Sequence, residues 1–129
     1  MEFPKDLKYT KNDEWVRVQG NSATVGITDY AQNQLSDIVF VEIIVAVGDL
    51  VKQGDSCATV ESVKAAADVY MPVSGKVVAI NETLPDSPEI INNDPYGAAW
   101  MVKVEMTNPA EIQEWLDAAT YQVNIESKE

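Results

Sequence analysis

The chain of 129 residues is long enough for one domain with one hydrophobic core, and 21 acidic against 9 basic side chains give it a formal net charge of −12. This charge repels nucleic acids and anionic membranes, so we expect neither as a partner and expect partner proteins with basic patches. Histidine is absent, which removes the usual general base near neutral pH and most zinc sites and argues against an independent hydrolase.

The first third of the chain predicts a β-hairpin, a short helix and a buried strand. Apolar alternation at 14–18 and 23–27 flanks a Gly-Asn-Ser turn, which is typical of two paired strands. Thr28 can cap a helix over Asp29–Leu35. The run Ile38–Ile43 is rich in β-forming residues and too apolar for an exposed edge, so we expect it in the core.

The rest of the chain predicts more strands and two helical pieces. Short apolar runs between Gly or Pro residues indicate strands at 57–61, 66–70, 76–80 and 100–105. A Ser-Pro-Glu sequence at 87–89 opens a brief helical turn. Asn108 and Pro109 open a helix over about 109–119 whose apolar stripe should pack on the sheet, while the tail 122–129 should be frayed. No low-complexity linker divides residues 1–129, so we expect a single domain.

The composition also favours a soluble protein in a reducing compartment. No apolar run approaches the roughly 18 residues that a membrane span needs, and the residues after Met1 carry acids and lysines instead of a signal-peptide pattern. Cys57 is the only cysteine, which excludes an internal disulfide, and we interpret it as a small buried strand residue rather than a reactive thiol. These features fit the cytoplasm of a bacterium or, after loss of a transit peptide, the mitochondrial matrix of a eukaryote.

Lys64 lies between two similar strand-turn units, Gly48–Asp55 and Met71–Val78, at the expected tip of a hairpin. This weak internal symmetry predicts two small sheets packed face to face and joined at one end by the hairpin. The alanines at 65–67 add little bulk, so Lys64 should stand in water where a modifying enzyme can grip the turn. The placement indicates a carrier with a modified lysine, without a catalytic residue or a metal site of its own, instead of a lysine that merely caps a turn.

The residues around Lys64 resemble the attachment site of lipoyl and biotinyl domains, in which a lysine at a hairpin tip receives the cofactor through an amide bond. Gly48 lies 16 residues before Lys64 and Gly75 lies 11 residues after it, as the flanking glycines do in that superfamily. Biotin carriers usually place Met on both sides of the lysine, whereas Val63 and Ala65 stand here, which favours lipoate. The attachment turn around Lys64 would consist of Glu61, Ser62, Val63 and Ala65.

Six blocks between Tyr9 and Tyr121 resemble, in order, the family of glycine cleavage system H proteins. The blocks are Tyr9–Lys11, Glu14–Val16, Val25–Gln32, Asp37–Val41, Glu61–Ala66 and Asn93–Gly97. The resemblance implies a mainly β barrel-sandwich hybrid of two small sheets, with a C-terminal helix and short helical turns, and with lipoate attached to Lys64.

The same resemblance implies a carrier component and not an enzyme. Its lipoyl arm would take the aminomethyl group of glycine from the pyridoxal phosphate enzyme glycine decarboxylase. It would pass the one-carbon unit to tetrahydrofolate at the aminomethyltransferase, with release of ammonia, and would then be reoxidised by dihydrolipoyl dehydrogenase. The enzyme that attaches lipoate would be the fourth partner.

Glu14 and Asp68 occupy positions that the family associates with holding the loaded arm. The aminomethyl group brings an ammonium next to a labile carbon–sulfur bond, so water must be excluded and a buried ammonium needs a carboxylate partner. The competing interpretation is that each acid is a solvated surface charge in a strongly acidic chain.

Two other functions stay open at this point. One is a paralogue of the family that relays lipoate to other complexes or serves a different redox partner, and the other is a binding module without a cofactor, in which native Lys64 would be unmodified. Departures from the family pattern keep the first alternative: Asp13 replaces a common histidine, Ser36 and Ala99 replace common glycines, and Ile43–Val47 replaces a shorter loop with proline. Ser36 would strain its turn if the backbone there has positive φ.

Overall fold

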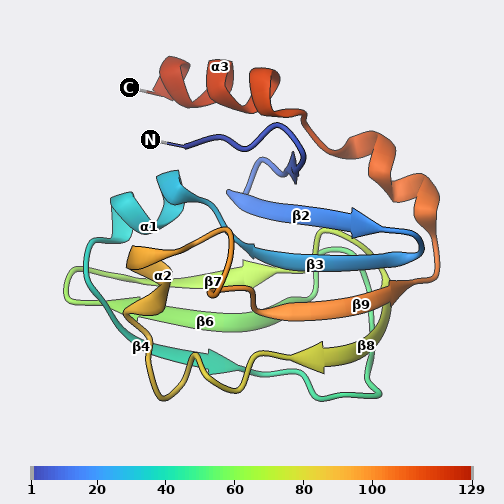
Figure 1. Cartoon of the computed structure of the whole chain (residues 1–129), viewed down its shortest axis with the longest axis horizontal. Coiled ribbons are helices and arrows are strands. Elements are labelled where there is room, and N and C mark those ends of the chain that lie inside the picture. Colours follow the sequence, from blue (N-terminus) through green and yellow to red (C-terminus); the bar gives the residue numbers. More distant parts are fainter. Residues whose placement is uncertain (1, 129) are drawn as a thin grey trace.

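The computed structural model describes residues 2–128, which form two antiparallel β-sheets with short helices around them (Figure 1). The larger sheet has the order β1-β2-β3-β9-β8-β5 and the smaller one the order β4-β6-β7. The strands are β1 (Lys8–Tyr9), β2 (Glu14–Gln19), β3 (Ser22–Ile27), β4 (Ile38–Ile43), β5 (Leu50–Val51), β6 (Ser56–Ser62), β7 (Ala66–Tyr70), β8 (Gly75–Ile80) and β9 (Val102–Met106). The helices are α1 (Asp29–Leu35), α2 (Ile90–Asn93), the 3-10 helix η1 (Pro109–Glu114) and α3 (Ala118–Lys128). The expected mainly β architecture of two sheets is confirmed.

Local sequence signals account for the first elements. β2 and β3 pair as the expected hairpin, with Glu14 opposite Ile27. Helix α1 begins where expected, because the Thr28 hydroxyl oxygen accepts a hydrogen bond of 3.2 Å from the backbone N–H of Ala31 and thereby caps the helix.

Strand β4 forms over the expected residues, but it lies at the edge of the smaller sheet. Its pairing with β6 shifts register between Ile38 and Phe40, so that Ile38 and Val41 point into the core. Val39 and Phe40 are 55% and 45% exposed. The expectation that the whole run lies in the core is therefore wrong for these two residues and for the exposed Glu42, because only one face of the strand packs against the core.

The two strand-turn units that flank Lys64 pair with each other in the larger sheet, whereas β6 and β7 both lie in the smaller sheet, so the expectation that the hairpin joins the two sheets is wrong. β5 and β8 are antiparallel neighbours, with Leu50 opposite Lys76, and the N–H of Gly48 donates to the carbonyl of Val77 at 2.8 Å. Gly48 has φ of +98°, a conformation that side chains disfavour. At Gly75 a side chain would run into the backbone carbonyl oxygen of Glu105 on the neighbouring strand β9. The glycine spacing around Lys64 therefore reflects two different backbone requirements.

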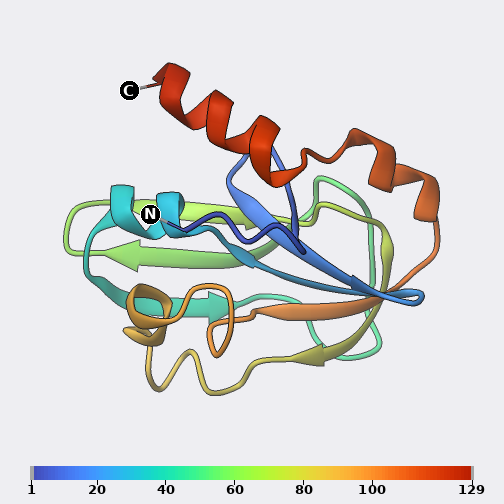
Figure 2. The same cartoon turned by 45° about the horizontal axis from the view of Figure 1, so that its top comes forward.

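Two apolar clusters hold the molecule together. The main cluster fills the space between the sheets and includes fully buried residues of both, such as Val25, Val60 and Val77. A second cluster lies under α3, where the rings of Tyr9 and Tyr121 stack at 4.7 Å between centroids. Figures 1 and 2 show α3 along the outer side of the N-terminal segment that contains β1.

The C-terminal region differs from the sequence-based expectation of one helix over 109–119 and a frayed tail over 122–129. A 3-10 helix ends at Glu114, Trp115 is extended, and α3 then runs from Ala118 to Lys128. Trp115 leaves the helix because its indole N–H donates to the carbonyl of Pro72 at 2.9 Å and because the backbone of Leu116 pairs with that of Tyr9.

The buried side chains of Tyr121 and Ile125 then hold α3 against the second cluster, so the predicted fraying is wrong for this segment. Glu129, the last residue of the predicted tail, lies outside the described residues. Within residues 2–128, no helix has the length and apolar character needed to cross a membrane.

Ser36 ends α1 with φ of 67° and ψ of −149°, a region that is populated almost only by glycine. The strain expected for a non-glycine residue with positive φ is therefore present. Ser36→Gly should raise the free energy of unfolding by about 1 kcal/mol, because relief of the strain exceeds the extra entropy of glycine in the unfolded chain. Urea unfolding measures the change. Ser36→Ala is the matched control, since it removes the hydroxyl but keeps Cβ, and an equal gain in both variants would contradict the strain.

Candidate functional site

Lys64 stands at the exposed tip of the β6–β7 hairpin, on a turn that Ser62 holds together. The Ser62 hydroxyl oxygen accepts hydrogen bonds from the backbone N–H groups of Lys64 and Ala65, at 3.0 and 2.9 Å, and donates to the carbonyl of Ala65 at 3.0 Å. The backbone N–H of Ser62 donates to the same carbonyl at 2.7 Å. Glu61 pairs with Ala66 at the base of the turn, and Val63 is 70% exposed. The structure thus places the lysine on a fixed turn in solvent.

The hairpin tip is also tied to the segment between α1 and β4. The backbone N–H of Val63 donates to the carbonyl of Asp37 at 3.1 Å, and the Lys64 ammonium lies 3.5 Å from the carbonyl oxygen of Gln34. Figures 1 and 2 show α1 and the turn between β6 and β7 at the same end of the molecule. Lys64 is therefore held close to the C-terminal end of α1.

A cavity of about 200 Å³, here called the α1 cavity, lies between α1, β7 and the residues that lead into β2. Its walls combine an apolar surface with several polar side chains. The lining residues are Asn12, Asp13, Glu14, Ile27, Ala31, Gln34, Leu35, Val60, Ala67, Asp68 and Val69. The structure brings Glu14 and Asp68, both predicted from the sequence, to this one cavity.

Glu14 is a buried carboxyl group that joins the two sheets. Its side chain is 2% exposed, and its carboxylate accepts hydrogen bonds from the Thr10 hydroxyl at 2.6 Å and from the backbone N–H of Tyr70 at 3.3 Å. Burial raises the pKa of Glu14 and the nearby charge of Asp13 raises it further, while the two hydrogen bonds oppose this shift. The interpretation of Glu14 as a solvated surface charge is therefore wrong.

Asp68 lies in a different environment although it lines the same cavity. Its side chain is exposed, and the Thr59 hydroxyl lies 3.4 Å from its carboxylate across the β6–β7 pair. Asp68 can thus supply negative charge at the solvent side of the α1 cavity, while Glu14 supplies a carboxyl group inside it.

A second cavity, here called the Trp115 cavity, has a volume of about 520 Å³ and shares Asn12 and Glu14 with the first. Its wall is formed by the segment that leads into β2, the loop after β5, the end of β7 with the residues that follow it, and the end of η1. The lining residues are Thr10, Lys11, Asn12, Glu14, Gln53, Gly54, Tyr70, Met71, Pro72, Glu114 and Trp115. Asn12 and Glu14 therefore line both cavities.

Cys57 and Trp15 have structural surroundings. Cys57 is fully buried. Burial is the main cause that raises the pKa of its thiol to about 12, and the charge of Glu14 contributes less, as expected for a structural residue. Trp15 is buried in the second cluster, where its indole N–H donates to the carbonyl of Pro95 at 2.8 Å. Among residues 2–128, no group of Cys, Asp and Glu side chains is arranged to hold a metal ion.

Sequence reasoning missed four residues at the site: Thr10, Asn12, Ala31 and Gln34. For Ala31 and Gln34 the sequence held a signal, because positions 31, 34 and 35 share one face of a helix and therefore line the same surface. Thr10 and Asn12 lie in a short loop before β2, and nothing in their spacing indicates that they face a cavity.

Comparison with known proteins places the whole chain in one family. Residues 7–128 match the family model described as glycine cleavage H-protein. The chain is 53% identical over 125 residues to the glycine cleavage system H protein of Carboxydothermus hydrogenoformans, which covers 97% of this chain and 95% of that one. It is 55% identical over 118 residues to the protein of the same name from Symbiobacterium thermophilum, with 92% and 91% covered.

A solved structure is also similar. The crystal structure of a glycine cleavage system H protein from Mycobacterium marinum superposes with a TM-score of 0.86 at 37% identity, and covers 95% of this chain and 98% of that one.

The raised pKa of Glu14 should make the stability of the unmodified protein depend on pH. The folded state holds this proton more tightly than the unfolded chain, so the contribution of Glu14 to stability is fully present below the usual pKa of 4.5 and is lost as pH rises through the raised value. The glutamine in Glu14→Gln does not titrate. The free energy of unfolding of wild type relative to this variant should therefore fall as the pH is raised from about 4 to about 7. Urea unfolding at both pH values measures the difference.

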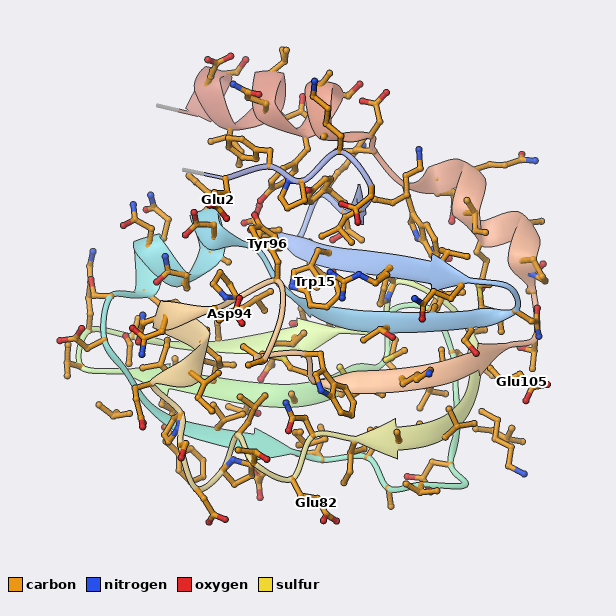
Figure 3. The ribbon with its side chains drawn as sticks, in the orientation of Figure 1. Glu2, Trp15, Glu82, Asp94, Tyr96 and Glu105 are labelled. Atoms are coloured by element: carbon orange, nitrogen blue, oxygen red, sulfur yellow. The ribbon has the colours of Figure 1, made fainter. Side chains whose placement is uncertain are left out.

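Glu82, which is exposed and labelled in Figure 3, offers the matched control variant Glu82→Gln. If the stability of wild type relative to Glu82→Gln fell with pH in the same way, Glu14 would not be the cause of the change.

Proposed function

Because this chain belongs to the glycine cleavage H-protein family, we propose that Lys64 is the residue that carries the lipoyl group. The function of the protein is that of a lipoyl carrier in the glycine cleavage system, and it is not an enzyme. The observation that supports Lys64 is its position on an exposed, hydrogen-bonded turn whose tip is tied to the end of α1. A fixed turn in solvent is what a modifying enzyme needs in order to select one lysine among several.

The α1 cavity is within reach of an arm attached to Lys64. A β-strand rises about 3.3 Å per residue, so Ala67–Val69 lie about 10 to 17 Å from Lys64 along β7, and Tyr70–Pro72 about 20 to 26 Å. An extended lysine side chain with a lipoyl group spans about 14 Å on ordinary bond lengths. These distances are upper limits, because Lys64 and Ala65 lie in the turn and β7 begins at Ala66. The arm therefore reaches the α1 cavity, whereas the part of the Trp115 cavity beyond Tyr70 lies farther along the chain.

The residues of the α1 cavity suit a hydrocarbon arm that ends in an ammonium. When bound, the lipoyl group supplies the sulfur that takes up the aminomethyl group. Ile27, Leu35 and Val69 would cover the hydrocarbon part of the arm and exclude water from the carbon–sulfur bond. The Glu14 carboxylate would pair with the ammonium, because a buried cation needs an anionic partner.

Asp68 would attract the same cation at the rim of the cavity. The raised pKa of Glu14 is consistent with a carboxyl group that lacks a cation while the arm is elsewhere.

Family membership implies association with the other components of the glycine cleavage system. We propose that the arm visits glycine decarboxylase, the aminomethyltransferase and dihydrolipoyl dehydrogenase in turn, and that a separate enzyme attaches lipoate. The net charge of −12 supports docking surfaces with basic side chains on these partners.

Replacing Lys64 tests the attachment point. Lys64→Arg should fold normally and gain no lipoyl mass, because the modifying enzyme reads the position in the hairpin and arginine offers no amine for the amide bond. Intact-mass measurement after incubation with the lipoylating enzyme gives the result. Lys76→Arg, an exposed lysine on β8, is the matched control and should be modified like wild type. Lipoylation that persists in Lys64→Arg would overturn the assignment.

The loaded protein, with the aminomethyl group on its arm, tests Glu14 and Asp68. Glu14→Gln keeps the shape of the side chain but removes its charge, which should shorten the lifetime of the loaded protein by about tenfold, the loss expected for a hydrogen bond to a charged group of about 1.5 kcal/mol. Asp68→Asn should have a smaller effect because Asp68 is exposed. Released formaldehyde and ammonia, measured without any partner enzyme, follow the decay.

Lipoylation of both variants and reoxidation by the dehydrogenase should stay near normal, and Glu82→Gln should decay like wild type. Equal decay in all four proteins would mean that apolar burial alone protects the cargo.

A further inference from the structure

Tyr121 connects the C-terminal helix to both sides of the α1 cavity through its hydroxyl group. The side chain is 1% exposed and its ring stacks on that of Tyr9. The hydroxyl donates a hydrogen bond of 2.9 Å to the Asp13 carboxylate and lies 2.7 Å from the hydroxyl oxygen of Thr28. Since the single proton of Tyr121 goes to Asp13, the Thr28 hydroxyl donates to Tyr121.

These contacts form one directed series of hydrogen bonds. The backbone N–H of Ala31 donates to the Thr28 hydroxyl oxygen, Thr28 donates to Tyr121, and Tyr121 donates to Asp13. Its first and last members, Ala31 and Asp13, both line the α1 cavity, one on α1 and the other in the loop before β2. Asp13 has φ of 67° and directly precedes Glu14, so its orientation is coupled to the backbone of the buried carboxyl group.

A second tyrosine shows that the start of α1 is held from outside the helix. The Tyr96 hydroxyl accepts from the backbone N–H of Asp29 at 3.0 Å and donates to the carbonyl of Glu2 at 2.7 Å. Figure 3 labels Glu2 and Tyr96 beside the beginning of α1. Tyr96 thus joins the start of α1 to the N-terminal segment. Tyr121, in contrast, joins α1 to the loop on the other side of the cavity.

We infer that Tyr121 is a positioning residue for the loaded arm: its hydroxyl sets the separation between α1 and the Asp13–Glu14 loop, and with it the fit of the α1 cavity around the aminomethyl cargo. This inference rests on the proposed use of the α1 cavity and adds to it a residue of the C-terminal helix that touches neither arm nor cargo. Without the hydroxyl, the apolar stack and the fold remain, but the two walls are no longer joined.

Tyr121→Phe tests this role, because it removes only the hydroxyl group. The lifetime of the loaded protein should fall about threefold, less than the tenfold expected for Glu14→Gln, because Tyr121 acts on the cargo only through the walls of the cavity. In the unmodified protein, amide exchange at Ala31 should become about fivefold faster, because its acceptor Thr28 loses its own partner.

Tyr9→Phe is the matched control. It removes a hydroxyl from the same aromatic stack, where the Tyr9 hydroxyl donates to the carbonyl of Pro4 at 2.6 Å, away from the cavity. Both variants should lose similar stability, but Tyr9→Phe should keep the wild-type lifetime and the wild-type exchange at Ala31. Equal lifetimes in the two variants would overturn the inference.

Thr28 provides an independent check if Tyr121→Phe does not fold. Thr28→Val breaks the same series while keeping the shape of the side chain, and Thr28→Ser restores the hydroxyl. The lifetime should fall in the valine variant and recover in the serine variant, and failure to recover would contradict the role of the series. Glu14→Gln separates the two proposals. A short lifetime in Glu14→Gln with no effect of Tyr121→Phe overturns the positioning role alone, whereas a wild-type lifetime in both variants overturns the pairing of Glu14 with the cargo and the positioning role together.

Discussion

The Glu14 carboxylate accepts hydrogen bonds from the loop before β2 and from the end of β7, and so ties the larger sheet to the strand that carries the lysine hairpin. A carboxyl group that is 2% exposed and has only neutral donors around it is costly to hold in the charged form. Its burial makes sense when a cation is bound beside it for part of the working cycle. One side chain thus joins the two sheets and, in the proposed cycle, would also recognise the cargo.

Structural elements that depend only on residues close to them in the sequence could be predicted. Thr28 and the residues after it specify α1, because a capping hydroxyl needs only the next turn of the helix. The turn around Lys64 is equally local, since the Ser62 side chain satisfies the backbone groups that the reversal leaves free. The flanking glycines were recognisable by their spacing, although the reasons for them, a positive φ at Gly48 and a close strand at Gly75, are visible only in the fold.

Features that depend on distant partners could not be predicted in this way. Trp115 interrupts the expected C-terminal helix because Pro72 and Tyr9, far away in the chain, offer it and its neighbour better partners. The sequence also gives no means of separating buried Glu14 from exposed Asp68, since both are acids on strands. The hydrogen bond between Tyr121 and Asp13 joins residues 108 positions apart.

The position of Cys57 has a consequence for a protein that carries a disulfide-containing group. A thiolate close to such a group would attack it and trap the arm on its own carrier. Cys57 lies on β6, the strand that leads to Lys64, yet it is fully buried and its thiol has a pKa of about 12. The chain has no other cysteine, so a disulfide-containing arm on Lys64 would meet no competing thiolate on its own carrier.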